Sequence, residues 1–476
     1  MNTLSYLAIV VACTGAISEA QSTFDKRSFS LNVFSGRQLN QYNDGAVARR
    51  KALSKYGMDI PAALQRRQAA PQTNVTATDI AVTEMDDLEY LSPVLVGDTA
   101  MMLDFDTGSS DLWVFSNLLP SSVTAGHDVY DIGSNSTGTE LQGSSWQISY
   151  ADGSGAQGLV YADKVVVGGA TATSQAVEAA TSISTEFVSE NSDGLMGLGF
   201  GISNTIRPQK QPTFFENIKS SLQLPVFAVS LKKNATGTYD FGFIDPNKYT
   251  VSLDNFAILR ACLTKAKGEI QYIGVNSSRG YWEFTMTGYA VGNATTTIPA
   301  DFQAIADTGT TLMLLPPAIV DAYYVQVPNS QDSSSEGGFV FPCDTILPDL
   351  TVTMGGGNGD GSATATIPGE LMNRSLSTTG SGLCYGGIQQ TSDGFSIWGD
   401  VFLKSQFVVF DGSDPPRLGF APQADGVSNN ATTTSGSPPS STASVSIATE
   451  SSMLIPNGTD LGSGEGFTFA HNYPEE

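Results

Sequence analysis

Two Asp-Thr-Gly turns carry the residue types of this chain that could do chemistry together. The first contains Asp106 and the second Asp307, and each acid follows a hydrophobic run and precedes another apolar segment. A single such turn is typical of an ordinary hairpin, because Asp and Gly favour tight turns. The second copy indicates two similar β units, each presenting one carboxyl group into a shared site.

Two carboxyl groups held together cannot both ionise at the same pH, because the negative charge of one raises the pKa of the other. The pair then shares one proton. The ionised acid can take a proton from water while the protonated acid donates to a peptide carbonyl group. Water would therefore attack the peptide without a covalent intermediate, and Asp106 and Asp307 are the predicted catalytic residues.

Each acid is followed by the same three kinds of neighbour: a threonine, a glycine and a second hydroxyl residue. The glycine permits a tight turn behind the acid. The threonine hydroxyl could tie the two turns together, and the second hydroxyl could hydrogen-bond the carboxylate. The predicted supporting residues are Thr107, Gly108, Ser109, Thr308, Gly309 and Thr310.

Few other catalytic groups are available in the sequence. Of the two histidines, His127 lies in a polar loop with no nucleophile motif beside it, and His471 lies in a low-complexity tail. A Ser-His-Asp or Cys-His site is therefore not favoured. No Cys/His cluster has zinc spacing and no Gly-rich loop is placed to cradle phosphate, so we expect no metal and no other cofactor.

The length and composition favour a mostly β protein. The 476 residues include 49 Gly and 22 Pro, which suits two or three turn-rich domains. Residues 164–167, 227–231 and 406–410 are short β-branched or aromatic segments bounded by Gly, Asp or Asn, which predicts strands. The best helical patterns are residues 212–222 and 316–324, each with Pro near its start.

The charge excludes two classes of partner. The sequence holds 23 basic and 47 acidic residues, for a net charge of −24. Such a chain repels nucleic acids and anionic membranes, so we expect neither as a partner. Crowded carboxylates repel one another at neutral pH and lose that repulsion on protonation, which favours an acidic working medium.

Residues 89–424 resemble the pepsin-like aspartic proteases, most closely the secreted fungal members of the penicillopepsin and aspergillopepsin kind. Residues 106–114 match the family's first catalytic loop, and residues 150–154 match its flap. Residues 195–197 and 397–399 match the apolar-apolar-Gly segments behind the two loops. The resemblance implies a two-lobed fold in which each lobe is a β-barrel-like domain with one catalytic Asp. It also implies an endopeptidase that cuts polypeptides in acid, preferring hydrophobic residues beside the scissile bond.

The resemblance also assigns substrate binding to the flap. Ala151 stands where the family usually has Gly, and Tyr150 would hydrogen-bond Trp113. In fungal relatives an Asp at the position of Asp152 is associated with cleavage after Lys. On the residues alone, the aromatic side chains could also be core residues and the Asp a turn former. The expected flap and substrate-binding residues are Tyr150, Asp152, Gly153, Ser154 and Trp113.

The cysteines fit an exported protein. Cys13 would leave with the signal peptide, so Cys262, Cys343 and Cys384 remain. Cys343 and Cys384 bracket a Gly-rich stretch, and the resemblance implies that they form a disulfide. Such a bridge would stabilise the fold by about 4 kcal/mol on the chain-entropy model. Cys262 is then left without a partner.

The sequence divides into five parts. An apolar core and a small-residue end indicate a signal peptide, for which a membrane anchor is the alternative. A basic segment that ends at Arg66-Arg67 indicates a prosegment, and a Ser/Thr-rich end without Lys or Arg indicates a disordered tail. We therefore expect a secreted, extracellular monomer. The parts are residues 1–20 (signal), 21–67 (prosegment), 68–245 and 246–424 (protease lobes) and 425–476 (tail).

The prosegment contains one residue that could act on the site. Residues 52–56 resemble the Lys-Tyr region of the family's prosegments, where the ammonium group lies on the catalytic carboxylates and blocks water. Lys55 would supply that ammonium group here. The alternative is a solvated basic helix.

Two other classes of protein remain possible from sequence. A two-carboxylate glycoside hydrolase would also need paired acids, but twin Asp-Thr-Gly turns have no explanation in that class. A binding protein on the same fold would normally have lost one Asp or one Gly of the turns. Both turns are intact.

Residues 251–267 are expected to be absent from the working enzyme. Their removal joins Lys248-Tyr249-Thr250 to a Gly-Glu-Ile sequence, which restores the fungal pattern, and it also removes Cys262. A retained intron would account for both facts, because 17 codons keep the reading frame. A surface-loop insertion is the alternative, since long loops cost little free energy.

In peptide mass spectrometry of the secreted protein, we expect a peptide that runs from Thr250 directly into Gly268. Detection of a tryptic peptide from within residues 251–265 would refute the hypothesis that residues 251–267 are absent from the working enzyme.

Overall fold

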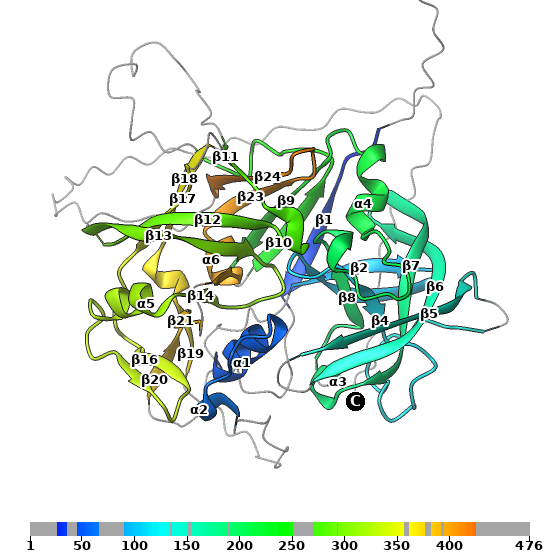
Figure 1. Ribbon diagram of the computed structural model, residues 1–476, viewed down its shortest axis with the longest axis horizontal. Helices are drawn as coiled ribbons and strands as arrows, with labels where there is room; N and C mark the ends of the chain where they lie inside the picture. Colours follow the sequence, from blue (N-terminus) through cyan, green and yellow to red (C-terminus); the bar gives the residue numbers. More distant parts are fainter. Residues whose placement is uncertain are drawn as a thin grey trace, which may run out of the picture. The chain divides into compact units, whose positions relative to one another are not determined.

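The computed structural model contains many strands and few, short helices, as the sequence predicted (Figure 1). It describes residues 26–35, 45–65, 90–133, 136–150, 154–188, 190–233, 235–250, 270–292, 294–356, 361–376, 382–391 and 395–424. The predicted signal peptide, the Arg66-Arg67 junction, Asp152, Gly153, residues 251–267 and the predicted tail lie outside these ranges. No helix within the ranges is long and apolar enough to cross a membrane.

The first lobe is a closed ring of six strands. The pairing of β6 with β2, at Leu95 opposite Val166, closes the ring, and β5 (Thr139–Ser149) lies against β6 outside it. Val160, Val165 and Val167 of β6 are fully buried in its core, and the predicted strand 164–167 is the end of β6. The order around the ring is β2 (Tyr90–Val96), β3 (Thr99–Asp106), β8 (Gly194–Gly197), β4 (Leu112–Val114), β7 (Ala170–Ile183) and β6 (Gly155–Val167).

A shared sheet joins the two halves of the chain. β23 and β9, which hold the predicted strands 406–410 and 227–231, pair with each other, and Phe410 stacks on Phe227 at 4.7 Å between ring centroids. Both strands are near-continuous hydrophobic runs because both of their faces are buried. The order is β11 (Gln271–Gly274), β24 (Arg417–Pro422), β23 (Gln406–Asp411), β9 (Val226–Lys232), β10 (Ala235–Phe241), β1 (Phe29–Ser35) and β2.

Two further sheets build the second lobe. The larger has the order β18 (Ser362–Ile367), β17 (Leu350–Gly355), β12 (Glu283–Val291), β13 (Ala294–Ala306), β22 (Ser396–Trp398), β14 (Met313–Leu315) and β21 (Ile388–Gln390). The smaller has the order β15 (Gln331–Ser333), β16 (Gly338–Pro342), β20 (Leu383–Gly386) and β19 (Asn373–Leu376). The mostly β, two-lobed prediction is therefore confirmed, with the second lobe built from two sheets where the first has one ring.

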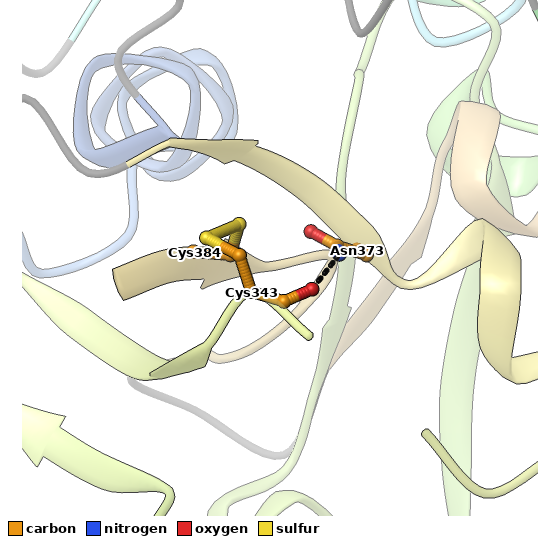
Figure 2. Close-up of a disulfide and its surroundings, with 3 residues drawn as sticks. All are labelled: Cys343, Asn373 and Cys384. Atoms are coloured by element: carbon orange, nitrogen blue, oxygen red, sulfur yellow. Dashed lines mark hydrogen bonds between the residues drawn. A yellow bond between two sulfur atoms is a disulfide. The ribbon is translucent and has the colours of Figure 1, made fainter. Parts of the chain in front are cut away.

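The predicted disulfide is confirmed. Cys343 follows β16 and bonds to Cys384 of β20, with an S–S distance of 2.04 Å (Figure 2). The Asn373 side chain donates a hydrogen bond to the Cys343 carbonyl oxygen at 3.2 Å, which ties β19 to the same bridge. The bridge therefore links the two central strands of the smaller sheet at one end.

The helices are short and lie where turn and cap residues allow them. The predicted helix 316–324 is α5 (Pro317–Tyr324). The predicted helix 212–222 is shorter, because α4 (Phe214–Ile218) continues only as a 3₁₀ turn, although a capping box formed by Thr213 and Glu216 starts it. The remaining α-helices are α1 (Gly45–Lys55), α2 (Ala62–Gln65), α3 (Thr185–Val188) and α6 (Asp400–Leu403).

Candidate active site

The same strand arrangement positions both acids. β3 ends at Asp106 and runs parallel to β8, and β4 returns antiparallel to β8. In the second lobe β13 ends just before Asp307 and runs parallel to β22, and β14 returns antiparallel to β22. Each acid therefore leaves the end of an interior strand at the same point of an equivalent pattern.

A glycine behind each loop makes this arrangement possible. A Cβ atom added at Gly197 would lie 2.6 Å from backbone nitrogen atoms of the first loop, at Ser110 and Asp111. A Cβ atom added at Gly399 would lie 2.0 Å from the Thr310 carbonyl oxygen of the second loop. The apolar-apolar-Gly segments therefore need Gly at their third position so that the backbones can approach closely.

Two buried threonines join the loops. Thr107 Oγ1 donates to the Ala306 carbonyl oxygen at 2.8 Å, and Thr308 Oγ1 donates to the Phe105 carbonyl oxygen at 2.5 Å. Each hydroxyl oxygen also accepts the backbone N–H of the other threonine at 3.0 Å. These four bonds form a nearly symmetric lattice that brings the predicted residues of the two turns together.

Both carboxyl groups are fully buried, and their neighbours differ. The backbone N–H groups of Gly108 and Gly309 each donate to the acid two residues earlier, at 2.8 and 2.9 Å. Thr310 Oγ1 donates to Asp307 Oδ2 at 2.5 Å. The buried Ser109 hydroxyl group makes no hydrogen bond with any described residue. Of the two hydroxyl groups expected to bond a carboxylate, the structure brings only that of Thr310 into place.

Lys55 and Tyr56, at the end of α1, lie on the two acids. Lys55 Nζ is 2.7 Å from Asp106 Oδ1 and 3.0 Å from Asp307 Oδ1. Tyr56 donates its hydroxyl proton to Asp307 Oδ2 at 2.7 Å. The sequence singled out Lys55, but it gave no role to the tyrosine hydroxyl group.

The electrostatics separate the two acids. Burial raises the pKa of Asp106, and the charge of Asp307 raises it further. Lys55 acts in the opposite direction, and the resulting pKa is about 6. Burial also acts to raise the pKa of Asp307, but Lys55 and hydrogen bonds donated by Asp106, Thr310 and Tyr56 lower it to about 2. The pair therefore shares one proton over a range of acidic pH. Burial acts to lower the pKa of Lys55, but the two carboxylates outweigh it and raise that pKa.

The flap residues that the structure describes lie beside this site. The Tyr150 backbone N–H donates to the Ser154 carbonyl oxygen at 2.8 Å, which closes a hairpin. The buried Trp113 Nε1 atom has no hydrogen-bond partner among the described residues, so the expected bond to Tyr150 is not formed. Phe187 contacts both rings, with centroids 5.3 Å from Trp113 and 5.9 Å from Tyr150. An aromatic contact through Phe187 therefore links the two residues.

Sequence reasoning missed a buried network behind the first loop. Asp111 Oδ1 accepts the Thr205 backbone N–H at 2.7 Å and the Asn204 side-chain amide at 2.7 Å. Asn204 also donates to Glu178 Oε1 at 3.1 Å. Burial and then the charge of Asp111 hold the pKa of Glu178 well above its usual value, which favours the protonated form of Glu178. The pattern Asp-Thr-Gly-Ser-Ser-Asp contains no signal for this contact, because its partners are distant in sequence.

The comparisons with known proteins agree with this geometry. The family of eukaryotic aspartyl proteases matches residues 89–423. Penicillopepsin-2 of Penicillium janthinellum is 47% identical over 423 residues, which cover 88% of this chain and 98% of the relative. Aspergillopepsin-1 of Aspergillus oryzae is 50% identical over 376 residues, 79% of this chain and 85% of the relative.

The chain therefore belongs to the eukaryotic aspartyl proteases. It is a pepsin-like aspartic endopeptidase, a hydrolase that acts on polypeptides, and it resembles the fungal penicillopepsins and aspergillopepsins over most of its length. This membership excludes the glycoside hydrolase that the sequence left open, and the two intact Asp-Thr-Gly turns argue against a binding protein on the same fold.

The threonine lattice generates a stability prediction. Thr308→Val removes a hydroxyl group and leaves the buried Thr107 N–H and one lone pair of the Phe105 carbonyl oxygen without a partner. An unsatisfied buried group costs about 1–3 kcal/mol, so we expect the free energy of unfolding to fall by about 3 kcal/mol. Denaturant unfolding of the full chain measures this change. Thr308→Ser keeps the hydroxyl group and is the matched control; equal losses in both variants would contradict the role of the lattice.

Proposed function

We propose that Asp106 and Asp307 are the catalytic pair of this endopeptidase, and that the chain is made as a zymogen. The observation that carries the proposal is a single ammonium group, that of Lys55, within 3.1 Å of oxygen atoms of two fully buried carboxyl groups from equivalent loops. Burying three ionisable groups together costs free energy, so such a cluster is expected mainly where function requires it.

The shared proton defines the chemistry of the pair. When the prosegment leaves, the space of the Lys55 ammonium group becomes available to a water molecule between the two acids. The ionised acid takes a proton from this water as its oxygen attacks the peptide carbonyl carbon, and the protonated acid donates to the carbonyl oxygen. The acid that took the proton from water then gives it to the leaving nitrogen, the C–N bond breaks, and the other acid takes back the proton from the hydroxyl group of the intermediate, which restores the starting state of the pair. Buried N–H groups at Gly108 and Gly309 keep the carboxyl groups oriented throughout.

The surroundings of the acids support a preference for hydrophobic residues. The Tyr56 ring lies against Tyr281, with centroids 5.6 Å apart, and against Phe395 at 6.1 Å. In the first lobe, Phe187 lies beside Tyr150. A substrate that replaced the prosegment would place a side chain in each of these aromatic environments, where burial of apolar surface stabilises the complex. Cleavage after Lys, through Asp152, rests on the sequence resemblance alone.

Contacts of α1 with both lobes support the zymogen. The buried Arg49 donates to the Gly337 and Gln390 carbonyl oxygens at 2.8 Å each, in the second lobe. Lys51 pairs with Glu190 of the first lobe at 2.7 Å. β1 adds to this docking by pairing with β10 and β2. The basic excess of the prosegment therefore has specific partners, which the alternative of a solvated helix does not explain.

The processing and export of the chain follow from sequence. We propose a signal peptide at residues 1–20 and a prosegment at residues 21–67 that is removed after Arg66-Arg67. Residues 68–245 and 246–424 would form the lobes of a secreted, monomeric enzyme, followed by the tail at residues 425–476.

The catalytic pair is tested by removing one charge at a time. Asp106→Asn and Asp307→Asn should each reduce kcat for a peptide substrate by at least about a thousandfold while the circular dichroism of the fold is unchanged, because neither amide can share the proton. Asp98→Asn, an exposed acid outside the site, is the matched control. Substantial hydrolysis by either site variant would refute the mechanism.

We call the contact of Lys55 with Asp106 and Asp307 the lock, and its pH dependence tests it. Asp106 is ionised above about pH 6, so at neutral pH Lys55 faces two carboxylates. A carboxyl group whose pKa is lowered on docking stabilises the docked state above its ordinary pKa, and the Asp307 contribution is lost as pH falls towards about 2. Lys55 acts to lower the pKa of both acids, although burial keeps that of Asp106 at about 6, so its attraction weakens first as Asp106 is protonated near pH 6 and again as Asp307 is protonated towards pH 2.

Lys55→Gln should convert to mature enzyme at least about tenfold faster than the parent at neutral pH, because it lacks the charge that holds the acids. Gel analysis of the full chain over a pH series measures this conversion. Lys164→Gln, at a half-exposed lysine on β6, is the control. A Lys55→Gln chain as latent as the parent at neutral pH would show that the ammonium group does not lock the site.

A further inference from the structure

His127 is buried against the first lobe, in the loop between β4 and β5. Its side chain is only 3% exposed. The imidazole ring stacks on Phe115, with ring centroids 3.9 Å apart and an angle of 12° between the planes. The proposed catalytic reaction does not use this residue, and its position is too enclosed for a solvated loop histidine.

Both ring nitrogen atoms of His127 face backbone carbonyl oxygens. Nδ1 lies 3.1 Å from the Ser192 oxygen, and Nε2 lies 3.1 Å from the Val188 oxygen. A carbonyl oxygen can only accept a hydrogen bond, and a neutral imidazole has one N–H. Only the imidazolium form donates to both oxygens, so the geometry selects the cation.

Charged neighbours agree with this assignment. Asp193 Oδ1 lies 3.7 Å from Nδ1 and also accepts the Asp128 backbone N–H at 2.9 Å. The second oxygen of Asp193 accepts the Met102 backbone N–H at 2.7 Å, which ties it to β3. Burial acts to lower the pKa of His127, but Asp193 and the two carbonyl oxygens outweigh it and raise that pKa above the ordinary value. Asp193 is the acidic side chain that contacts the ring.

The three acceptors all belong to one segment, which we call the α3 segment and define as residues 185–188 with residues 190–193. It carries Phe187, whose ring contacts Trp113 and the flap residue Tyr150. It also carries Glu190, which pairs with Lys51 of the prosegment. Figure 1 shows α3 at the end of the first lobe where β5 ends and β6 begins. His127 therefore fixes the backbone of the segment that carries Phe187, the residue in contact with Tyr150 of the flap.

We propose that His127, as an imidazolium ion, is a positioning residue that fixes the α3 segment and so holds Phe187 against Tyr150 at the substrate-binding side of the first lobe. This inference rests on the proposed function in assigning Tyr150 to substrate binding. A histidine whose pKa is raised by folding stabilises the folded segment fully below its unfolded pKa. The stabilisation is lost as pH rises through the folded pKa, so the segment is held in acid and released towards neutral pH.

Nuclear magnetic resonance of the full chain carrying Asp106→Asn, which should be unable to cleave off its own prosegment, tests the charge of His127 without using activity. The sequence has only two histidines, so the imidazole spectrum contains His127 and His471, and His127→Gln assigns them. We expect His127 to titrate at a higher pH than His471. A His127 that titrates below His471 would overturn the proposal.

Hydrogen exchange tests the segment itself in the same chain. Between about pH 5 and about pH 8, and after correction for the intrinsic rate, exchange in peptides from residues 185–193 should become about tenfold faster. In His127→Gln, which has no cationic form, exchange should be fast at both values. A segment equally protected in both chains at both values would overturn the proposal. His471→Gln is the control for loss of a histidine.

Kinetics separate positioning from a merely structural role. In the activated enzyme at about pH 5, His127→Gln should raise KM for a hydrophobic peptide about tenfold. It should change kcat by less than about twofold, because the catalytic pair of Asp106 and Asp307 is unchanged. A fall in kcat with KM unchanged would refute positioning. If the chain cleaves no peptide at all, the proposed function fails, whereas the titration and the exchange still decide the state of His127.

Discussion

Two carboxyl groups buried side by side are the constraint on which the rest of this structure depends. Isolated buried charges cost several kcal/mol each, so the fold must supply donors, a shared proton or a countercharge. Asp106 and Asp307 receive backbone N–H groups from the turns, and the threonine lattice fixes their separation. Each lobe therefore has to deliver one interior strand to the same place, which explains why the two strand patterns are equivalent.

In the proposed zymogen, the prosegment would act as a removable countercharge for this pair. Lys55 neutralises the acids at neutral pH, and Arg49 and Lys51 anchor its helix to opposite lobes. Protonation of Asp106 below about pH 6 would weaken the contact with Lys55, whereas the Arg49 bonds end on carbonyl oxygens, which do not titrate. On that proposal, latency and activity in acid would have the same electrostatic cause.

The two lobes differ in the acidic residues that lie behind the catalytic loops. The first lobe places Asp111 and Glu178 there, and the corresponding positions of the second lobe hold Leu312 and Gln389. Raised pKa values of Asp111 and Glu178, caused chiefly by burial, mean that this pair favours the folded state at low pH. That contribution declines as pH rises above their ordinary values. These shifts, and the raised pKa of His127 in the same lobe, therefore favour the folded state of the first lobe in acid.

The sequence by itself determined the elements whose signals are local. Twin Asp-Thr-Gly turns, short strands bounded by Gly and Asp, and Pro near the start of α5 are patterns of adjacent residues, and resemblance to a family supplied the pairing of Cys343 with Cys384. Only the tertiary structure decided which side chains meet across the chain. It placed the Tyr56 hydroxyl group on Asp307, left Ser109 and Trp113 Nε1 without the bonds expected of them, and enclosed His127. The physical reason is that a hydrogen bond between residues far apart in sequence depends on the packing of whole lobes, which no local pattern encodes.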